Sequence, residues 1–367
     1  MILEALLTAA GMLWKALWAL VLGYLISAGI QVLVTHRQMA AALGERNPAR
    51  AGLASIFGLI SSSCSFAALA ASRSVLVKGA HPMNSLAFLV ASTNLVIELG
   101  IVLWVLLGWT FALGNFLLGS IMIVYAYLLT LPWFPGRLAR DAREHAKQEL
   151  SAGVDEPDDE DFVARSWRQK LLSREGWRRI AQAFFMEWKM VYKEILFGFT
   201  VAGFIAVFVP QSFWNALFLE AGTDAPSFPA VLQNAAIAPV VAFFTFIGSM
   251  GNVPLAAMLW SKNAAFGGVM SFLGADLVAA TVVWIHVKYY GWRYAGYLSL
   301  LLYLCMVAAG VSVHYLYAAF DALPTARPTL EEMIRFSVDY TFWLNILFGC
   351  VATALLWLHF RLSRTNS

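Results

Sequence analysis

Residues 61–80 read SSSCSFAALAASRSVLVKGA and interrupt an otherwise apolar part of the chain. The stretch opens with small hydroxyl residues around Cys64, continues through alanines, and carries Arg73 and Lys78 near its end. Lipid cannot solvate free backbone N–H and C=O groups, so a helix that stops inside a membrane must line a cavity or be buried in protein. What the stretch means therefore depends on the class of the protein and on whether the interruption occurs again.

The composition indicates a membrane protein. Of the 367 residues, 60% are hydrophobic and 13% are charged, and the mean hydropathy is +0.69. Soluble domains carry about 25% charged residues. Several stretches exceed about 18 nearly uncharged residues, the length that a membrane-spanning helix needs. The sequence therefore predicts an all-α polytopic membrane protein.

Other classes of protein lack their usual signals. The net charge of +3, without basic residues interleaved with aromatic ones, argues against nucleic-acid binding. The three cysteines, Cys64, Cys305 and Cys350, have no metal-ligand or disulfide spacing. No ATP-binding loop, H-E-x-x-H or G-x-S-x-G motif is present, so we predict no cofactor, no metal and no catalytic residue. The expected partners are the lipid bilayer and a small-molecule or ion substrate, and a homo-oligomer remains open.

The charged residues divide the chain into parts. We predict a first membrane half at 1–131, a charged linker at 132–191, a second membrane half at 192–360 and a tail at 361–367. The linker holds eleven Lys and Arg residues and ends in a segment that mixes Trp and Phe with Arg and Lys, as an interfacial helix does. Because basic loops stay on the cytoplasmic side, linker and tail are predicted to face the cytoplasm of a bacterial inner membrane. A regulatory or partner-binding role for the linker remains an alternative.

The same rule constrains two apolar segments. All basic loops can face the cytoplasm together only if 51–77 and 230–261 each return to the side from which they enter. Both segments are therefore predicted to be re-entrant hairpins with a broken helix.

The interruption occurs a second time, at residues 245–275. A constant offset of 184 residues places Ser65 on Ser249 and Lys78 on Lys262. With two residues of slippage, NLV at 94–96 meets DLV at 276–278. The first hairpin would enter from the cytoplasm and the second from outside, which predicts two inverted repeats, an architecture that secondary transporters use.

The two interruptions carry residues suited to a central binding site. Half-helix ends offer backbone groups to polar solutes. Gly248 and Gly251 permit unusual dihedral angles, and Pro254 is expected to favour a helix start. The predicted substrate-binding residues are Ser62, Ser63, Cys64, Ser65, Asn94, Gly248, Ser249, Gly251, Asn252 and Pro254. For the serines and asparagines, simple capping of free backbone groups is the alternative, and Cys64 could be only a small buried residue.

Three charged residues in apolar surroundings are further candidates. Glu98 and Asp276 follow the two hairpins, and an intramembrane carboxylate is costly enough to suggest a proton-coupling role. The alternative is a structural carboxylate that caps a helix or pairs with a base. Arg73 could neutralise an anionic solute.

The strings SSCSFAALAASRSVLVKGA, FLVASTNLVIELGIVLWVLLGW and GSMGNVPLAAMLWSKNAAFGGVMSFLGADLV resemble the predicted permeases of the YraQ-like family. That bacterial family includes organoarsenical efflux permeases. The resemblance implies a plasma-membrane permease with duplicated halves, and it implies no particular substrate. Arsenical efflux in relatives goes with cysteine-bearing versions of the first motif, whereas this chain keeps only Cys64 there and has no cysteine in the second motif.

These observations predict a permease that moves a small solute by alternating access at a midplane site, with proton-coupled efflux as the preferred mechanism. A channel lined by the two hairpins is the alternative, followed by an intramembrane enzyme.

Overall fold

The computed structural model describes residues 1–33, 43, 47–61, 65–131, 135–150, 167–220, 222–223, 225–245, 248–327 and 340–363. Throughout these residues the elements are helices, with no strand. Eight helical stretches among them are long and apolar enough to cross a membrane. The predicted class, an all-α multi-pass membrane protein, is confirmed.

The helices fall into two sets on either side of a charged stretch. The helices before it are α1 (Ile2–Leu33), α3 (Pro48–Ile60), α4 (Ser65–Val77), α5 (Pro82–Asn94), α6 (Ile97–Leu107) and α7 (Trp109–Thr130). The charged stretch contains α8 (Gly136–Leu150) and α10 (Trp167–Leu172). The helices after it are α11 (Arg174–Phe208), α12 (Gln211–Leu217), α13 (Phe228–Thr245), α14 (Ser249–Ser261), α15 (Phe266–Leu273), the 3₁₀ helix η1 (Gly274–Val278), α16 (Ala280–Tyr290), α17 (Trp292–Ala319) and α19 (Tyr340–Ser363).

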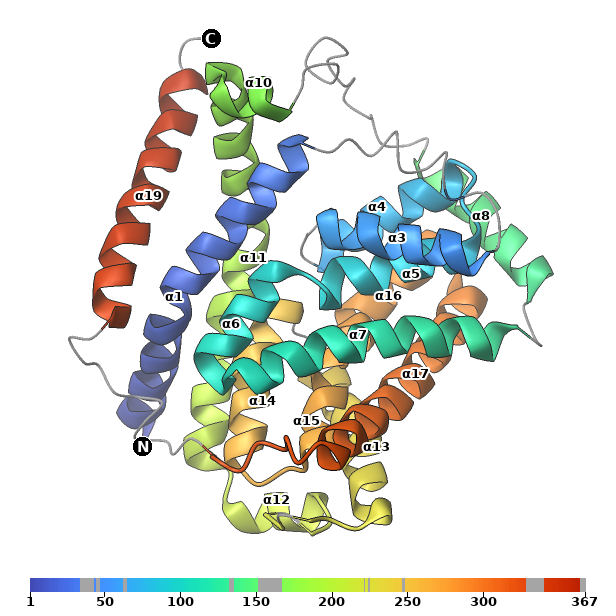
Figure 1. Cartoon of the computed structure of the whole chain (residues 1–367), viewed down its shortest axis with the longest axis vertical. Helices are drawn as coiled ribbons and strands as arrows, with labels where there is room; N and C mark the ends of the chain where they lie inside the picture. The colour runs from blue at the N-terminus through green and yellow to red at the C-terminus, as the bar shows by residue number, and fades with distance from the viewer. Residues whose placement is uncertain are drawn as a thin grey trace.

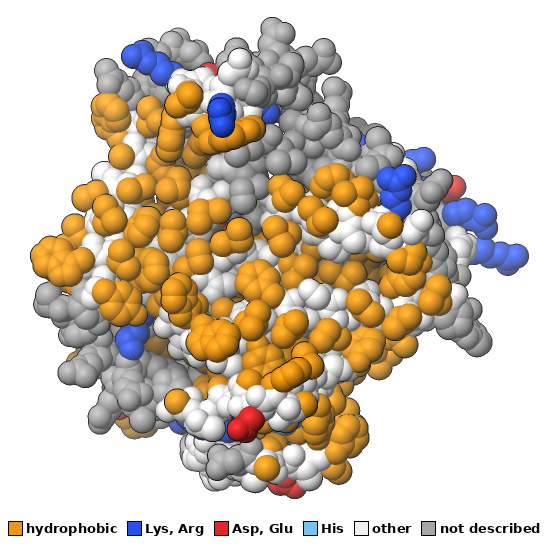
Figure 2. All heavy atoms as spheres, viewed as in Figure 1, with side chains coloured by type: hydrophobic (Ala, Val, Ile, Leu, Met, Phe, Trp, Pro, Cys, Tyr) orange, Lys and Arg blue, Asp and Glu red, His pale blue; other side chains and the backbone are white. Residues whose placement is uncertain are grey.

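Helices α1, α11 and α19 lie side by side along one flank, and the other helices pack next to them (Figure 1). On the face shown in Figure 2 apolar side chains cover most of the surface, while lysine and arginine lie mainly towards its edges. The large side chains of Trp104, Leu128 and Phe244 are each more than half exposed. This is the surface expected of a protein whose solvent is lipid.

The interruption at residues 61–64 separates two short helices. α3 and α4 have 13 residues each, which is about 20 Å at 1.5 Å per residue and less than a hydrocarbon core of about 30 Å. Asn47 caps α3 by accepting a hydrogen bond from the Ala49 N–H at 2.9 Å, and Pro48 occupies the first turn, where its missing donor costs nothing. In the second half, the 18-residue α13 precedes a short α14 of 13 residues.

Two further breaks, which the sequence did not predict, interrupt the apolar stretches 83–109 and 264–287. The chain leaves helical geometry at Val96, between α5 and α6, and at Ala279, where ψ is 142° and 144°. Between α15 and α16 it also tightens into η1. Apolar length predicts that a segment lies in the membrane, but it carries no information about the continuity of the helix.

The two halves share one order of elements. Each helix from α4 to α7 has a counterpart whose start lies 183 or 184 residues later, in α14, α15, α16 and α17. Gly108 and Gly291 link the last two helices of each half with φ of 95° and 79°, values that only glycine adopts without strain. The packing also corresponds, because α3 lies on α5 as α13 lies on α15, and α14 packs against α6 as α4 packs against α16.

The basic and aromatic segment before residue 191 joins the membrane helix after it. α11 continues from Arg174 to Phe208, and its membrane-spanning part is Val191–Phe208. The predicted boundary at 191/192 therefore lies within one helix, at the point where its sequence becomes apolar. Ser173 caps the start of α11 by accepting a hydrogen bond from the Gly176 N–H at 2.9 Å.

Asn345 of α19 bonds to the backbone of α1. Its Oδ1 accepts a hydrogen bond from the Trp18 N–H at 2.9 Å, and its Nδ2 donates to the Trp14 carbonyl at 2.8 Å. These two backbone groups lie one helical turn apart, so a single side-chain amide spans a turn of α1.

We expect an Asn345→Ala exchange to lower the stability of the protein by about 1 kcal/mol, because it removes two hydrogen bonds between α19 and α1. Thermal unfolding in detergent, followed by loss of the monodisperse peak in size exclusion, measures the effect. Thr353→Ala is the matched control, since that hydroxyl bonds only to Gly349 of its own helix. A loss no larger than that of the control would show that the two bonds do not stabilise the contact between α19 and α1.

Candidate functional site

The start of α14 lies beside a buried carboxylate. Gly248 is the residue before the helix, and the hydroxyl of the next residue, Ser249, donates a hydrogen bond to Oδ2 of Asp276 at 2.5 Å. Asp276 belongs to η1 and is only 1% exposed. The second interruption and the second candidate coupling residue therefore lie together.

A second carboxylate, from Glu194 of α11, approaches the same place. A Cβ atom built on Gly248 would lie 2.6 Å from Oε2 of Glu194, so the carboxylate rests against the glycine. One turn further along both helices Gly198 meets Gly251, and a Cβ on Gly198 would lie 2.6 Å from the Gly251 Cα. The two glycines thus bring α11 and α14 close enough for Glu194 to reach the start of α14. Glu194 and Asp276 thus reach neighbouring residues, Gly248 and Ser249, at the start of α14.

Asn252 is buried one turn inside α14. It is fully buried, and neither its Oδ1 nor its Nδ2 has a hydrogen-bond partner within the described part of the chain. At about 100° per residue, its direction on the helix lies between that of Ser249, which faces η1, and that of Gly251, which faces α11. Its amide therefore lies on the side of α14 where the two carboxylates approach.

Pro254 does not start a helix, as had been predicted, because α14 begins five residues earlier. It lies inside α14, where the missing N–H leaves the Met250 carbonyl without its usual ladder partner. Gly248 has extended backbone angles that any residue can adopt, and Gly251 matters for its close contact with Gly198. The glycines of this motif therefore provide space rather than unusual dihedral angles.

Two asparagines form hydrogen bonds at the corresponding break of the first half, between α5 and α6. Asn115 of α7 donates a hydrogen bond from Nδ2 to the carbonyl of Asn94 at 2.6 Å, and the Asn94 amide donates to Thr93 Oγ1 at 3.0 Å. Both asparagines are fully buried. The backbone of Glu98 lies against α1, since a Cβ built on Gly23 would lie 2.9 Å from the Glu98 Cα and would also meet the Glu98 Cβ.

One turn of α7 packs against both the break between α5 and α6 and the start of η1. A Cβ on Gly119 would lie 2.8 Å from Leu95 and 3.0 Å from the Asn94 Cβ, whereas a Cβ on Gly274 would meet Met122 and Leu118 at 3.0 and 3.2 Å. The first break therefore lies on one side of this turn and the second on another. This turn of α7 therefore contacts Asn94 of the first half and the start of η1 in the second half.

Other predicted residues lie elsewhere. Ser62, Ser63 and Cys64 are outside the described residues, and of Ser65 the structure describes only that it begins α4. Arg73 of α4 stacks its guanidinium over the Tyr289 ring of α16, 4.0 Å from the centroid. This contact places Arg73 at the far end of α16 from Asp276.

The family model described as "Predicted permease" matches residues 1–315. The chain belongs to this family. A relative from Mycobacterium tuberculosis (strain ATCC 25618 / H37Rv), named "Putative permease Rv2963", is 39% identical over 326 residues, which cover 88% of this chain and 79% of the relative. No solved structure matches the chain. With eight candidate spans, membership of a permease family indicates a membrane transporter.

All site residues of this permease lie within the matched region, whereas α19 follows it. Sequence reasoning missed Glu194 and Asn115. The signal for Glu194 was available, since it is an acid within the apolar stretch 192–209, which is the criterion that selected Glu98 and Asp276. Asn115 had no such signal, because a single amide in an apolar helix is common.

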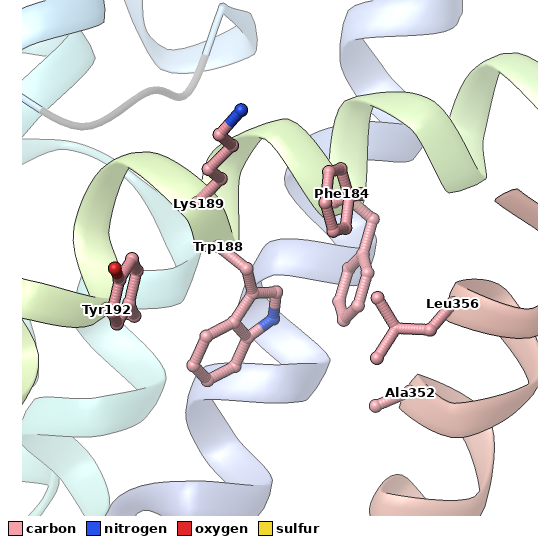
Figure 3. Close-up of a pocket in the computed structure, with 7 residues that line it drawn as sticks. Phe184, Trp188, Lys189, Tyr192, Ala352 and Leu356 are labelled. Carbon is pink, nitrogen blue, oxygen red and sulfur yellow. The ribbon is translucent and has the colours of Figure 1, made fainter. Parts of the chain in front are cut away.

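A separate cleft of the permease lies between α11 and α19. It has a volume of about 370 Å³ and is lined by Phe184, Phe185, Trp188, Lys189, Tyr192, Ala352 and Leu356. Figure 3 shows aromatic rings and the two aliphatic side chains towards the cleft, while the Lys189 amine points away. No group of three or more His, Cys, Asp or Glu side chains that could hold a metal ion occurs among the described residues.

Proposed function

We propose that the protein carries a small solute across the membrane by alternating access, at a central site between its two sets of broken helices. The observation that carries this proposal is the correspondence of the halves, in which every helix from α4 to α7 has a counterpart at a nearly constant offset. Paired broken helices near the midplane are a recurring design of secondary transporters.

The proposal includes two inverted repeats with re-entrant hairpins. Its support is the distribution of Lys and Arg, which puts the charged linker and the tail in the cytoplasm if α3–α4 and α13–α14 each return to their side of entry. The short α3, α4 and α14 are consistent with hairpins that stop within the membrane.

We assign substrate contact to the residues around the breaks that sequence reasoning selected, and proton coupling to Glu98 and Asp276. Both acids are almost completely buried in helices that follow a break. No ATP-binding motif is present in the sequence, so uphill transport would draw on an ion gradient or on an interacting ATPase, and we propose the proton gradient. Outward transport is the direction that the family resemblance suggests.

Sided cysteine labelling tests the proposal without knowledge of the solute. Single cysteines replace Ser65 or Ser249 in a chain without Cys64, Cys305 and Cys350, and a membrane-impermeant thiol reagent is applied to each face of the membrane. Because Ser249 is buried in this structure, a cysteine at its position can react only when the start of α14 opens to water. We expect labelling from one face to rise as labelling from the other falls when the pH gradient is reversed.

Two control positions calibrate this labelling. A cysteine at Phe244, whose side chain is 66% exposed on α13, faces lipid and should stay unreactive. A cysteine at Thr223, exposed in the connection before α13, should react from the outer face only. Inert cysteines under all conditions would contradict the proposal, and reactivity from both faces at once would indicate a channel.

A further inference from the structure

The cleft between α11 and α19 lies where both helices cross the edge of the membrane. The apolar span of α11 begins at Val191, and that of α19 ends at Phe360. The Phe185 ring of α11 stacks on the His359 ring of α19, with 4.3 Å between the ring centroids. This contact brings the two boundaries to within about two helical turns of each other. The cleft, which begins beside this contact, therefore lies at the level where hydrocarbon meets the lipid headgroups.

Aromatic contacts hold the walls of the cleft in place. The Trp188 ring lies against the Phe184 ring, with 6.3 Å between centroids, and against the Tyr24 ring of α1 at 5.4 Å. Phe185 is held by its stack on His359. The space of about 370 Å³ is therefore bounded by side chains that their neighbours fix. Beside a bilayer such a space is filled by hydrocarbon, because wall atoms without neighbours lose their dispersion contacts.

Two lysines give the cleft a positively charged mouth. The stem of Lys189 lines the cleft while its amine points away from it (Figure 3). Lys193, one turn further along α11, holds its amine 5.9 Å from the centroid of the Tyr192 ring, which also lines the cleft. Both lysines are exposed, and neither forms an ion pair with another described residue. Like charges at i,i+4 spacing repel each other, so an anion near both amines would stabilise them.

We propose that this cleft binds one anionic phospholipid, with an acyl chain between α11 and α19 and the phosphate near the amines of Lys189 and Lys193. The apolar walls require hydrocarbon, and the two cations at the mouth require a negative charge at the membrane boundary. A phospholipid with a net negative charge combines both, whereas a zwitterionic lipid supplies the chain without the net charge. Trp188 and Tyr192 suit this level, where tryptophan and tyrosine are enriched. The site does not depend on the transport proposed above.

Native mass spectrometry of the full-length protein tests the charged part of the site. The protein is delipidated in detergent and offered phosphatidylglycerol and phosphatidylethanolamine in equal amounts, and we expect it to retain one phosphatidylglycerol in preference. The double exchange Lys189→Gln, Lys193→Gln should lower this preference by about 20-fold, because each basic residue near a membrane surface contributes about a factor of five. Lys288→Gln is the matched control, since this exposed lysine on α16 does not line the cleft.

A second variant tests the apolar part of the site. Ala352→Phe places a ring in the cleft and should abolish retention of the lipid although both lysines remain. Ala354→Phe adds the same ring at an exposed position of α19 outside the cleft and should retain the lipid. The unfolding temperature in detergent shows whether each variant is folded. The lysine exchanges alter only exposed side chains, so they keep the test decisive if Ala352→Phe does not fold.

Four results would overturn the lipid site. The first two are equal retention of the two lipids by the parent protein and an unchanged preference in the double lysine variant. The third is full retention by folded Ala352→Phe, which would mean that the lipid binds to surface charge alone. The fourth is a dimer that forms as the lipid is removed and that Ala352→Phe abolishes, which would assign the cleft to a second copy of the chain.

Discussion

An Asp276→Asn exchange is expected to reduce, by about tenfold, the transient current that a pH step evokes in reconstituted membranes, because a neutral amide does not take up the proton. A proton that enters a buried carboxylate moves charge through a low-dielectric region, so its binding produces such a current even without a solute. The measurement uses proteoliposomes adsorbed to a solid-supported electrode, with pH steps of both signs.

The companion variants separate the coupling candidates. Glu98→Gln together with Asp276→Asn should leave no transient current, whereas Glu187→Gln should retain the normal amplitude. A double variant that keeps the full current would remove both Glu98 and Asp276 from the proposed proton pathway. Empty liposomes define the background.

Gly198→Ala is expected to cause a large loss of stability, because the added methyl group meets the backbone of a neighbouring helix. The new Cβ would lie 2.6, 2.7 and 3.0 Å from the Cα, O and C atoms of Gly251, all of which are backbone. No side chain can turn aside, so α11 and α14 must separate. Overpacking of this kind costs about 1–3 kcal/mol, and it also withdraws Glu194 from Gly248.

Gly296→Ala on α17 is the matched control, because its Cβ would have no atom within 4 Å. That exchange should stabilise the helix by about 0.5–1 kcal/mol, because alanine loses less backbone entropy than glycine. Thermal unfolding in detergent compares the two variants with the parent protein. Equal unfolding temperatures for both variants would show that the contact between Gly198 and Gly251 yields without cost.

The sequence predicted the class of the fold and the place of the two interruptions that precede α4 and α14. Hydropathy and clusters of small polar residues are local signals, which is why these features could be predicted. The sequence did not predict the breaks at Val96 and Ala279. The first break has a partner that is distant in sequence, the Asn115 amide that bonds the Asn94 carbonyl. The inverted arrangement and the re-entrant path stay predictions.

Prediction of the site succeeded where a residue's chemistry is unusual for its surroundings. Asp276 and Ser249 were selected separately, and the structure joins them by a hydrogen bond. Glu194 was missed because it follows a strongly charged segment, in which one more acid does not stand out. Its proximity to Gly248 depends on the close approach of Gly198 and Gly251, which no pattern in either helix alone predicts.

The amide of Asn345 bears on how the chain is assembled during synthesis. α19 leaves the ribosome after α1, so α1 can already lie in the membrane as a helix that satisfies its own backbone groups. When α19 arrives, the Asn345 amide bonds the Trp18 N–H and the Trp14 carbonyl, and one polar side chain thereby fixes the height at which the late helix docks on the early one. α19 lies beyond the region that the family model matches.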